Sequence, residues 1–108
     1  MRQAKVYFKK AAAGLLTQLD DGSFIFRYDD QWMVDNSKPS ISLTLPKERQ
    51  EYSSDHLFPF FYNMLPEGTN KKIVCMHMRI DENDYFGLLL TTAQYDTIGA
   101  VTVKKMDI

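Results

Sequence analysis

Residues 57–68 read Leu-Phe-Pro-Phe-Phe-Tyr-Asn-Met-Leu-Pro-Glu-Gly and form the most apolar and most aromatic stretch of the chain. Residues 53–55, Ser-Ser-Asp, stand just before it and can cap a helix, because their side-chain oxygens accept hydrogen bonds from free backbone N–H groups. Pro59 fits only in or near a first helical turn, and Pro66 disfavours the helical conformation of the residue before it. We therefore expect a helix of about two to three turns that ends before Pro66.

Apolar side chains surround this expected helix almost completely, and Asn63 is its one clearly polar position. A helix that is apolar all round is usually buried all round. One interpretation is a central core helix. The other is a helix that packs on the sheet of its own domain with one face and on a second protein with the other, because so short a chain struggles to cover both faces.

Length and composition indicate one ordinary globular domain, since 108 residues fall within the common domain size of roughly 100–150. The formal net charge of −1, from 13 basic and 14 acidic residues, argues against a nucleic-acid binder, which usually carries a basic excess on one face. No apolar run approaches about 18 residues, so no membrane span is expected. The first residues lack the apolar core of a signal peptide, and the single cysteine cannot form an internal disulfide, so a cytoplasmic location is expected.

Four strands are expected before the aromatic stretch, because apolar and polar residues alternate there with the period of a half-buried strand. Residues 20–22, Asp-Asp-Gly, indicate a hairpin turn, since glycine adopts positive φ without a steric penalty. In the strand that follows, Phe24, Phe26 and Tyr28 share one face. The predicted strands cover residues 5–9, 14–19, 23–28 and 40–45, with a turn at 11–14.

The polar connections carry two further expectations. Asp29 or Asp30 is expected to start a short helical turn within residues 29–38. Trp32 in this turn is interpreted as a plug that closes one end of the core rather than as a ligand contact. Residues 47–54 are polar and of mixed charge, so they predict a surface loop.

Two more helices and a last strand are expected after the aromatic stretch. Residues 70–80 have helical periodicity, with Ile73, Met76 and His77 on one side. A helix starting over residues 85–90 contains Gly87, which would cost about 1 kcal/mol relative to alanine, so close packing is expected there. Residues 98–104 alternate and predict a closing strand.

The predicted strands follow one another in the sequence, and so do the predicted helices. This order indicates an α+β fold rather than alternating βαβ units. We expect a single domain over residues 1–108, with an antiparallel sheet of about five strands. The sheet would comprise a β-meander, the fourth strand and the C-terminal strand. About three helices should pack mainly on one of its faces.

The search for catalytic chemistry gives a negative result, because neither a phosphate-binding glycine loop nor a dinucleotide-binding glycine motif is present. Residues 84–87, Asp-Tyr-Phe-Gly, differ from the Asp-Phe-Gly of protein kinases by an extra residue and are interpreted as a helix start. His56 and His77 lack the spacing of a metal site, and Cys75 is interpreted as a buried, inert thiol. We expect no catalytic residue, no metal site and no cofactor.

Several stretches, taken in order, are similar to one family. The chain resembles the N-terminal subdomain of the HipA toxin kinases over essentially its full length. The most specific pieces are Leu-Pro-Glu-Gly at residues 65–68 and Gly-Ala-Val-Thr at residues 99–102. The stretches that carry the resemblance are residues 24–28 with Trp32 downstream, then 38–46, 58–68, 84–89 and 99–103.

The resemblance also implies a role. HipA-like kinases continue for several hundred residues into the part that holds ATP, metal and catalytic aspartate, whereas this chain stops at Ile108. A free-standing copy of the subdomain resembles HipS of the tripartite HipBST toxin–antitoxin systems, which binds and restrains a separately encoded HipA-like serine/threonine kinase. A HipB-like helix-turn-helix DNA-binding protein is a further candidate partner, with direct contact left open. No direct nucleic-acid or membrane contact is expected.

The predicted partner-binding surface is the aromatic stretch with its Leu-Pro-Glu-Gly turn. Hot spots favour aromatic anchors, so Tyr62 is nominated first, and Glu67 could accept hydrogen bonds from a cationic group on the partner. Core packing or turn formation is the alternative for each residue. The full predicted set is Phe58, Tyr62, Leu65, Pro66, Glu67 and Gly68.

Other functions remain open from the sequence alone. The chain could be an N-terminal lobe that a split kinase needs for activity, or a fragment of a longer HipA-like kinase. A small independent enzyme or ligand binder is a further alternative, and it would need a deep pocket with converging polar groups.

Overall fold

The computed structural model describes residues 1–93 and 100–106. Within them the chain forms strands and helices in an order that confirms the α+β prediction. The elements are β1 (Arg2–Phe8), β2 (Ala11–Gln18), β3 (Phe24–Tyr28), α1 (Asp30–Val34), β4 (Glu51–Ser54), α2 (Pro59–Tyr62), α3 (Gly68–Met78), α4 (Tyr85–Thr92) and β5 (Val101–Lys105).

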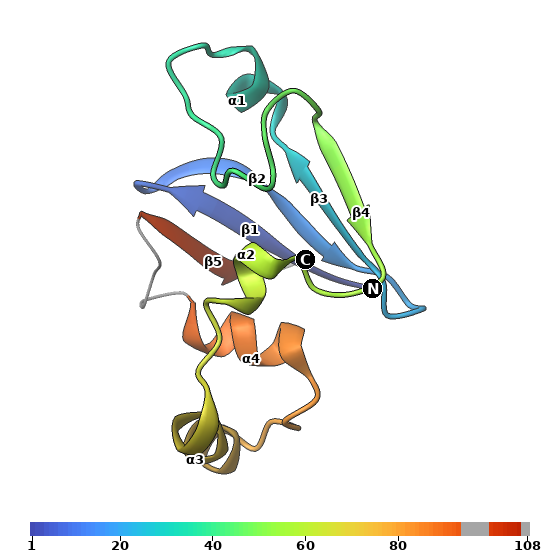
Figure 1. Cartoon of the computed structure of the whole chain (residues 1–108), viewed down its shortest axis with the longest axis vertical. Coiled ribbons are helices and arrows are strands. Elements are labelled where there is room, and N and C mark those ends of the chain that lie inside the picture. Colours follow the sequence, from blue (N-terminus) through green and yellow to red (C-terminus); the bar gives the residue numbers. More distant parts are fainter. Residues whose placement is uncertain (94–99, 107–108) are drawn as a thin grey trace.

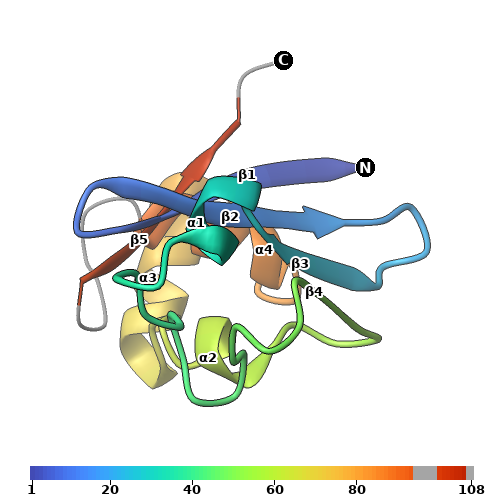
Figure 2. The same cartoon turned by 90° about the horizontal axis from the view of Figure 1, so that it is seen from above.

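The strands form one five-stranded antiparallel sheet in the order β4-β3-β2-β1-β5, which confirms the predicted sheet (Figure 1). The first three strands are the predicted meander. The last strand pairs with the first, so β1 lies inside the sheet and β5 at its edge. Helices α2, α3 and α4 all lie on one side of the sheet (Figure 2), as the sequence predicted.

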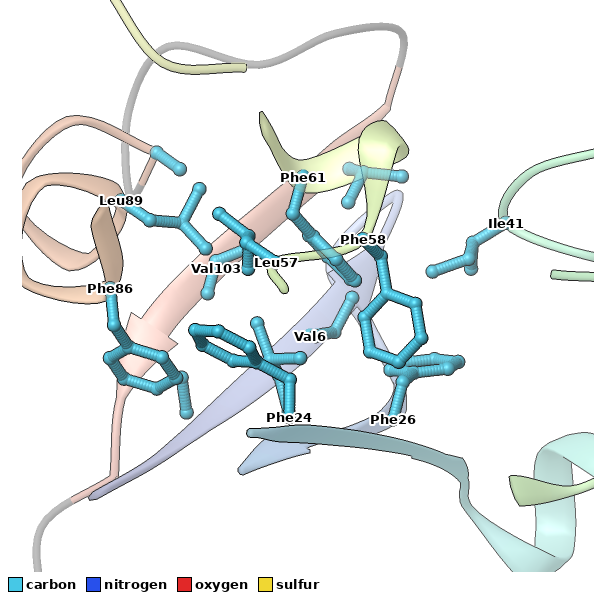
Figure 3. Close-up of a cluster of buried hydrophobic side chains, with 14 of the residues drawn as sticks. Val6, Phe24, Phe26, Ile41, Leu57, Phe58, Phe61, Phe86, Leu89 and Val103 are labelled. Atoms are coloured by element: carbon cyan, nitrogen blue, oxygen red, sulfur yellow. The ribbon is translucent and has the colours of Figure 1, made fainter. Parts of the chain in front are cut away.

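The core lies between the sheet and these helices. Alternate strand residues point inward, so Phe24 stacks on Phe86 of α4 with ring centroids 6.1 Å apart, and Phe26 contacts Phe61 of α2 at 5.8 Å (Figure 3). Burying each such side chain contributes about 1.5–3 kcal/mol relative to leaving it exposed. Trp32 of α1 is also buried and meets Phe8 edge to face, as predicted for a plug at one end of the core.

The predicted strand at residues 40–45 is wrong. These residues form turns, in which Ile41 and Leu45 are buried while Leu43 is 99% exposed. The Tyr28 hydroxyl donates to the Leu45 carbonyl and accepts from the Ile41 N–H at 3.1 Å, so one buried side chain satisfies backbone groups that a strand would have paired. Burial raises the pKa of Tyr28, which keeps this donor protonated.

The fourth strand is instead β4, inside the stretch predicted to be a surface loop. Residues 51–54 pair with β3, and Tyr52 lies opposite Phe26. Tyr52 is also the only apolar residue of this strand. A strand that contributes one apolar side chain has a weak alternation signal, which explains why the sequence pattern failed here.

The turn predicted at residues 11–14 is also wrong, because these residues belong to β2. The β1–β2 turn lies at Lys9 and Lys10, which adopt positive φ of 49° and 70°. The β1–β2 pairing shifts register between Val6 and Tyr7. Gly14 of β2 lies close to β3, where an added Cβ would lie 2.6 Å from the Arg27 carbonyl oxygen. The predicted turn at residues 20–22 is confirmed, with Gly22 at φ 88°.

Helix α2 is shorter than predicted. It makes a single turn, Pro59–Tyr62, and no side chain caps its start, because residues 53 and 54 belong to β4. Beyond it, the N–H groups of Met64 and Leu65 bond to carbonyls three residues back. These tighter turns replace the helix as the chain approaches Pro66.

Helices α3 and α4 form close to their predicted ranges. Asp84 caps α4 by accepting from the Gly87 N–H at 3.1 Å, which confirms the helix start. The close packing expected at Gly87 is confirmed, since an added Cβ would lie 2.4 Å from an Asp84 carboxylate oxygen. Of the closing strand, Val101–Lys105 is confirmed as β5, and Ile98 lies outside the described residues.

Candidate partner-binding site

Tyr62 and Tyr85 form the centre of the candidate site. Phe61 and Tyr62 are consecutive residues of the single-turn helix α2, so the first points into the core and the second toward solvent. Phe61 is fully buried, whereas Tyr62 is 47% exposed. The Tyr62 ring meets Tyr85, the first residue of α4, edge to face with centroids 5.6 Å apart.

The Tyr62–Tyr85 pair borders a hollow of about 170 Å³. The turn between α2 and α3 supplies most of the other lining, and Lys71 from the first turns of α3 completes it. The structure therefore brings together five of the six residues predicted from the sequence. These are Tyr62, Leu65, Pro66, Glu67 and Gly68.

Phe58 does not join this surface. It is 6% exposed and packs on Phe61 at 6.4 Å, so its side chain contributes to the core. Leu65 is 8% exposed and forms the floor of the hollow. Tyr62, Glu67 and Gly68 are the members of the predicted set that lie open to solvent.

The hollow carries one side chain of each charge. Glu67 is exposed and its carboxylate makes no capping hydrogen bond to α3. The Lys71 ammonium lies 5.2 Å from the centre of the Tyr85 ring. Sequence reasoning missed Lys71 and Tyr85, because their approach to Tyr62 depends on how α3 and α4 pack and not on any local pattern.

Arg2 holds the start of α4, and with it Tyr85, against the sheet. Its guanidinium donates to both carboxylate oxygens of Asp84, at 2.6 and 3.1 Å, and lies 5.1 Å from the centre of the Phe86 ring. The hydrogen bonds from Arg2, with a further one from the Gly87 N–H, hold the pKa of Asp84 below its ordinary value although partial burial opposes the shift. Asp84 therefore accepts bonds from both the sheet and the helix.

A second hollow, of about 380 Å³, also borders the tyrosine pair. Tyr62 and Tyr85 line both hollows, so the two rings form a wall shared between them. The lining of the second hollow combines the polar residues Asp55, His56 and Asn83 with the apolar Phe24 and Leu57. Side chains of a partner protein could fill the two hollows and contact the half-exposed aromatic pair between them.

Comparison with known proteins identifies the fold and the family. Residues 4–104 match the sequence model of the family described as HipA N-terminal domain. The chain belongs to this family. A solved structure of the N-terminal domain of HipA toxin matches with a TM-score of 0.72 and 32% identity, covering 99% of this chain and 94% of that one. The resemblance inferred from the sequence is thereby confirmed.

Relatives place the HipA N-terminal domain in chains of different length. A Haemophilus influenzae protein described as uncharacterized is 35% identical over 105 residues, which cover 97% of this chain and 93% of the relative. Two Sinorhizobium fredii proteins, “Putative kinase Y4mE” and “Putative kinase Y4dM”, are 27% and 34% identical over 82% of this chain. The matches cover 21% and 23% of those two proteins, so the chain spans about a fifth of their length.

Helix α3 of this HipA N-terminal domain exposes an unexpected apolar face. Ile73 is 48% exposed and Met76, three residues further along the same side of the helix, is 79% exposed, while Cys75 faces inward. The helix begins at Gly68, which also lines the first hollow, so α3 starts at the candidate site. Exposed apolar side chains grouped in this way mark interaction surfaces.

The described part of this HipA N-terminal domain offers little for metal chemistry. Across residues 1–93 and 100–106, no three histidine, cysteine or carboxylate side chains are grouped to hold a metal ion. The thiol of Cys75 is buried. None of the described helices combines the length and apolar character needed to cross a membrane.

Proposed function

We propose that this chain is a non-catalytic regulator that binds a HipA-family serine/threonine kinase and restrains it. The observation that carries the proposal is the half-exposed Tyr62, which packs on Tyr85 between two hollows. Membership of the HipA N-terminal domain family supports the choice of a HipA-family kinase as the partner.

The chemistry of the surface suits protein binding. Tyr62 is an aromatic anchor with two rotatable torsions, and further burial of its ring would release water from an apolar face. Glu67 is free to accept hydrogen bonds from a cationic side chain on the kinase. The apolar face of α3 would extend the contact beyond the hollow.

The same surface also supports a second function, in which the chain is an N-terminal lobe that a HipA-like kinase needs for activity. The two rhizobial relatives favour this alternative, because the matched domain makes up 21% and 23% of proteins named as kinases. A fragment of a longer kinase would use the surface in this way too. Both functions predict binding, and they differ in the sign of the effect on the kinase.

The test is a phosphorylation assay of a HipA-family kinase encoded beside this chain, with and without the purified chain. Restraint predicts that autophosphorylation falls as the chain is added, whereas a required lobe predicts that it rises. Failure of the two proteins to co-purify and to affect each other would reject both functions. Adding a HipB-like helix-turn-helix protein to the co-purification would show whether it joins the complex.

A further inference from the structure

The face of the sheet turned away from α2, α3 and α4 is not covered by these helices (Figure 2). Side chains alternate along each strand, and Ala4, Val6 and Val103 are fully buried on the helix side. Their neighbours Lys5 and Lys104 therefore point to the opposite, open face. Both lysines retain solvent exposure.

The strand register aligns the charges of this open face in one row. Lys104 of β5 lies opposite Lys5 of β1, which in turn lies opposite Leu15 of β2. The row continues to Arg27 of β3 and ends at Glu51 of β4. The face is therefore positive at the β1–β5 side, aliphatic in the middle and neutralised at the β4 side.

The two lysines lack a compensating charge within the described residues. None of the ion pairs found there includes Lys5 or Lys104, whereas Arg27 pairs with Asp30 at 3.3 Å. Like charges directly opposite each other on neighbouring strands destabilise a sheet. Lysines on an edge strand can protect it from aggregation, which accounts for Lys104 but not for Lys5 on an interior strand.

We propose that the open face of the sheet is a docking surface for an acidic segment of a partner protein. Carboxylates of that segment would lie between Lys5 and Lys104, and an apolar side chain would cover Leu15. A carboxylate bound between the two ammonium groups would offset their mutual repulsion. The positive surface is therefore complementary in charge to an acidic segment. This site lies on the side of the sheet opposite the Tyr62–Tyr85 pair, and the inference does not depend on the proposed kinase regulation.

The same features disfavour a nucleic acid as the occupant. The chain has a net charge of −1, and Glu51 ends the row with a charge that repels phosphate. The middle of the face is aliphatic at Leu15, so it offers no stacking platform for bases. Tyr7 is the aromatic residue beside the row, and the Lys104 ammonium already lies 5.6 Å from the centre of its ring.

The test is an amide NMR titration of the full chain with a synthetic peptide of alternating glutamate and leucine. The expected result is a set of shifts confined to β1, β2 and β5. A peptide in which glutamine replaces glutamate should bind about tenfold more weakly, and affinity for the acidic peptide should fall with salt. Shifts confined to the tyrosine pair, or no shifts at all, would overturn the proposal.

Variants complete the test. The double variant Lys5→Gln with Lys104→Gln should bind the acidic peptide about tenfold more weakly. It should keep the wild-type amide spectrum elsewhere, because the substitutions remove a repulsion. Lys72→Gln on the exposed surface of α3 is the matched control and should bind as the wild type does. Equal binding by the double variant and the wild type, or tighter binding of a single-stranded oligothymidine to this face, would reject an acidic protein segment.

Discussion

At the residue scale, Tyr62 is a half-exposed aromatic side chain next to a fully buried one. Its neighbour Phe61 is fully buried and connects α2 to the sheet, whereas the Tyr62 ring contributes one aromatic contact and leaves 47% of the residue open. An exposed aromatic ring held in place by a second ring is already ordered before a partner arrives, so binding it costs little side-chain entropy.

Tyr62→Ala is expected to weaken binding to the kinase by about 2 kcal/mol, roughly 30-fold in Kd, because an anchor between two hollows would be lost. Calorimetric titration would measure this change. Leu43→Ala is the control, because it removes a side chain that is 99% exposed in the turns between α1 and β4. This variant should bind the kinase as the wild type does. Wild-type affinity in the Tyr62 variant would exclude this tyrosine from the interface.

A second prediction at this scale concerns Asp84. Because the Arg2 hydrogen bonds lower the pKa of this carboxyl from its ordinary value of 3.8, the ion pair stabilises the fold above that pH and is lost as pH falls through the lower folded-state value. Asp84→Asn keeps a capping oxygen and removes the charge. The variant should be less stable by about 0.2–1 kcal/mol at pH 7, since both side chains are partly exposed.

Urea unfolding of the wild type and the Asp84 variant at pH 7 and at pH 3 would measure this difference. The two curves should approach each other at the lower pH. A gap that stays constant between the two pH values would show that the charge of Asp84 is not what stabilises the start of α4.

At the element scale, the buried Tyr28 side chain helps to fix the path of the segment between α1 and β4. Tyr28 bonds to the backbone of both Ile41 and Leu45, which holds two apolar side chains against the core without a strand. The chain is thereby free to place β4 beside β3.

Tyr28→Phe is expected to cost about 1–3 kcal/mol, because it leaves buried backbone groups of this segment without a partner. Hydrogen exchange should accelerate at the amide of Ile41 while the sheet amides of β1 and β2 stay protected. Unchanged exchange at Ile41 would mean that neighbouring turns hold the segment without the hydroxyl.

The pairing of β1 with β5 gives a second prediction for an element. Lys104→Glu replaces a like-charge pair with an opposite-charge pair opposite Lys5, so it should stabilise the chain by about 0.2–1 kcal/mol. The gain should shrink in high salt. Thermal unfolding at two salt concentrations would measure it, and a loss of stability would contradict the assigned register.

At the scale of the whole molecule, exposed apolar side chains lie on α3 as well as on the aromatic stretch for which the sequence predicted them. Leu57, Phe58, Phe61 and Leu65 of the aromatic stretch are buried, whereas Tyr62 is 47% exposed. On α3, Ile73 and Met76 are exposed as well, at 48% and 79%. A domain that presents such a surface beside a hollow is suited to a larger partner.

The double variant Ile73→Ser with Met76→Ser is expected to keep the stability of the free chain within about 0.5 kcal/mol, because both side chains lie on the surface. It should weaken kinase binding if the interface extends along α3 as proposed. Unfolding curves and the kinase titration would be measured together. A large loss of stability would show that this face packs on the chain itself.

Particular residues show what the sequence could predict and what it could not. Local signals worked at Gly22, at the alternating aromatics of β3 and at the Asp84 cap, because one or two neighbouring residues decide the backbone there. The pattern failed at residues 40–45, where distant Tyr28 replaces strand pairing, and at β4, whose single apolar residue gives little alternation. The approach of Tyr85 to Tyr62 depends on packing across the domain, so no local pattern contained it.

The position of β1 inside the sheet has a consequence for synthesis on the ribosome. Its partner on one side, β2, follows within a few residues, but its partner on the other side is β5, at residues 101–105. Until residues 101–105 leave the exit tunnel, one edge of β1 stays without its native neighbour, and an unpaired strand edge attracts other chains. Nascent chains of this domain are therefore expected to depend on chaperones until β5 has emerged and paired with β1.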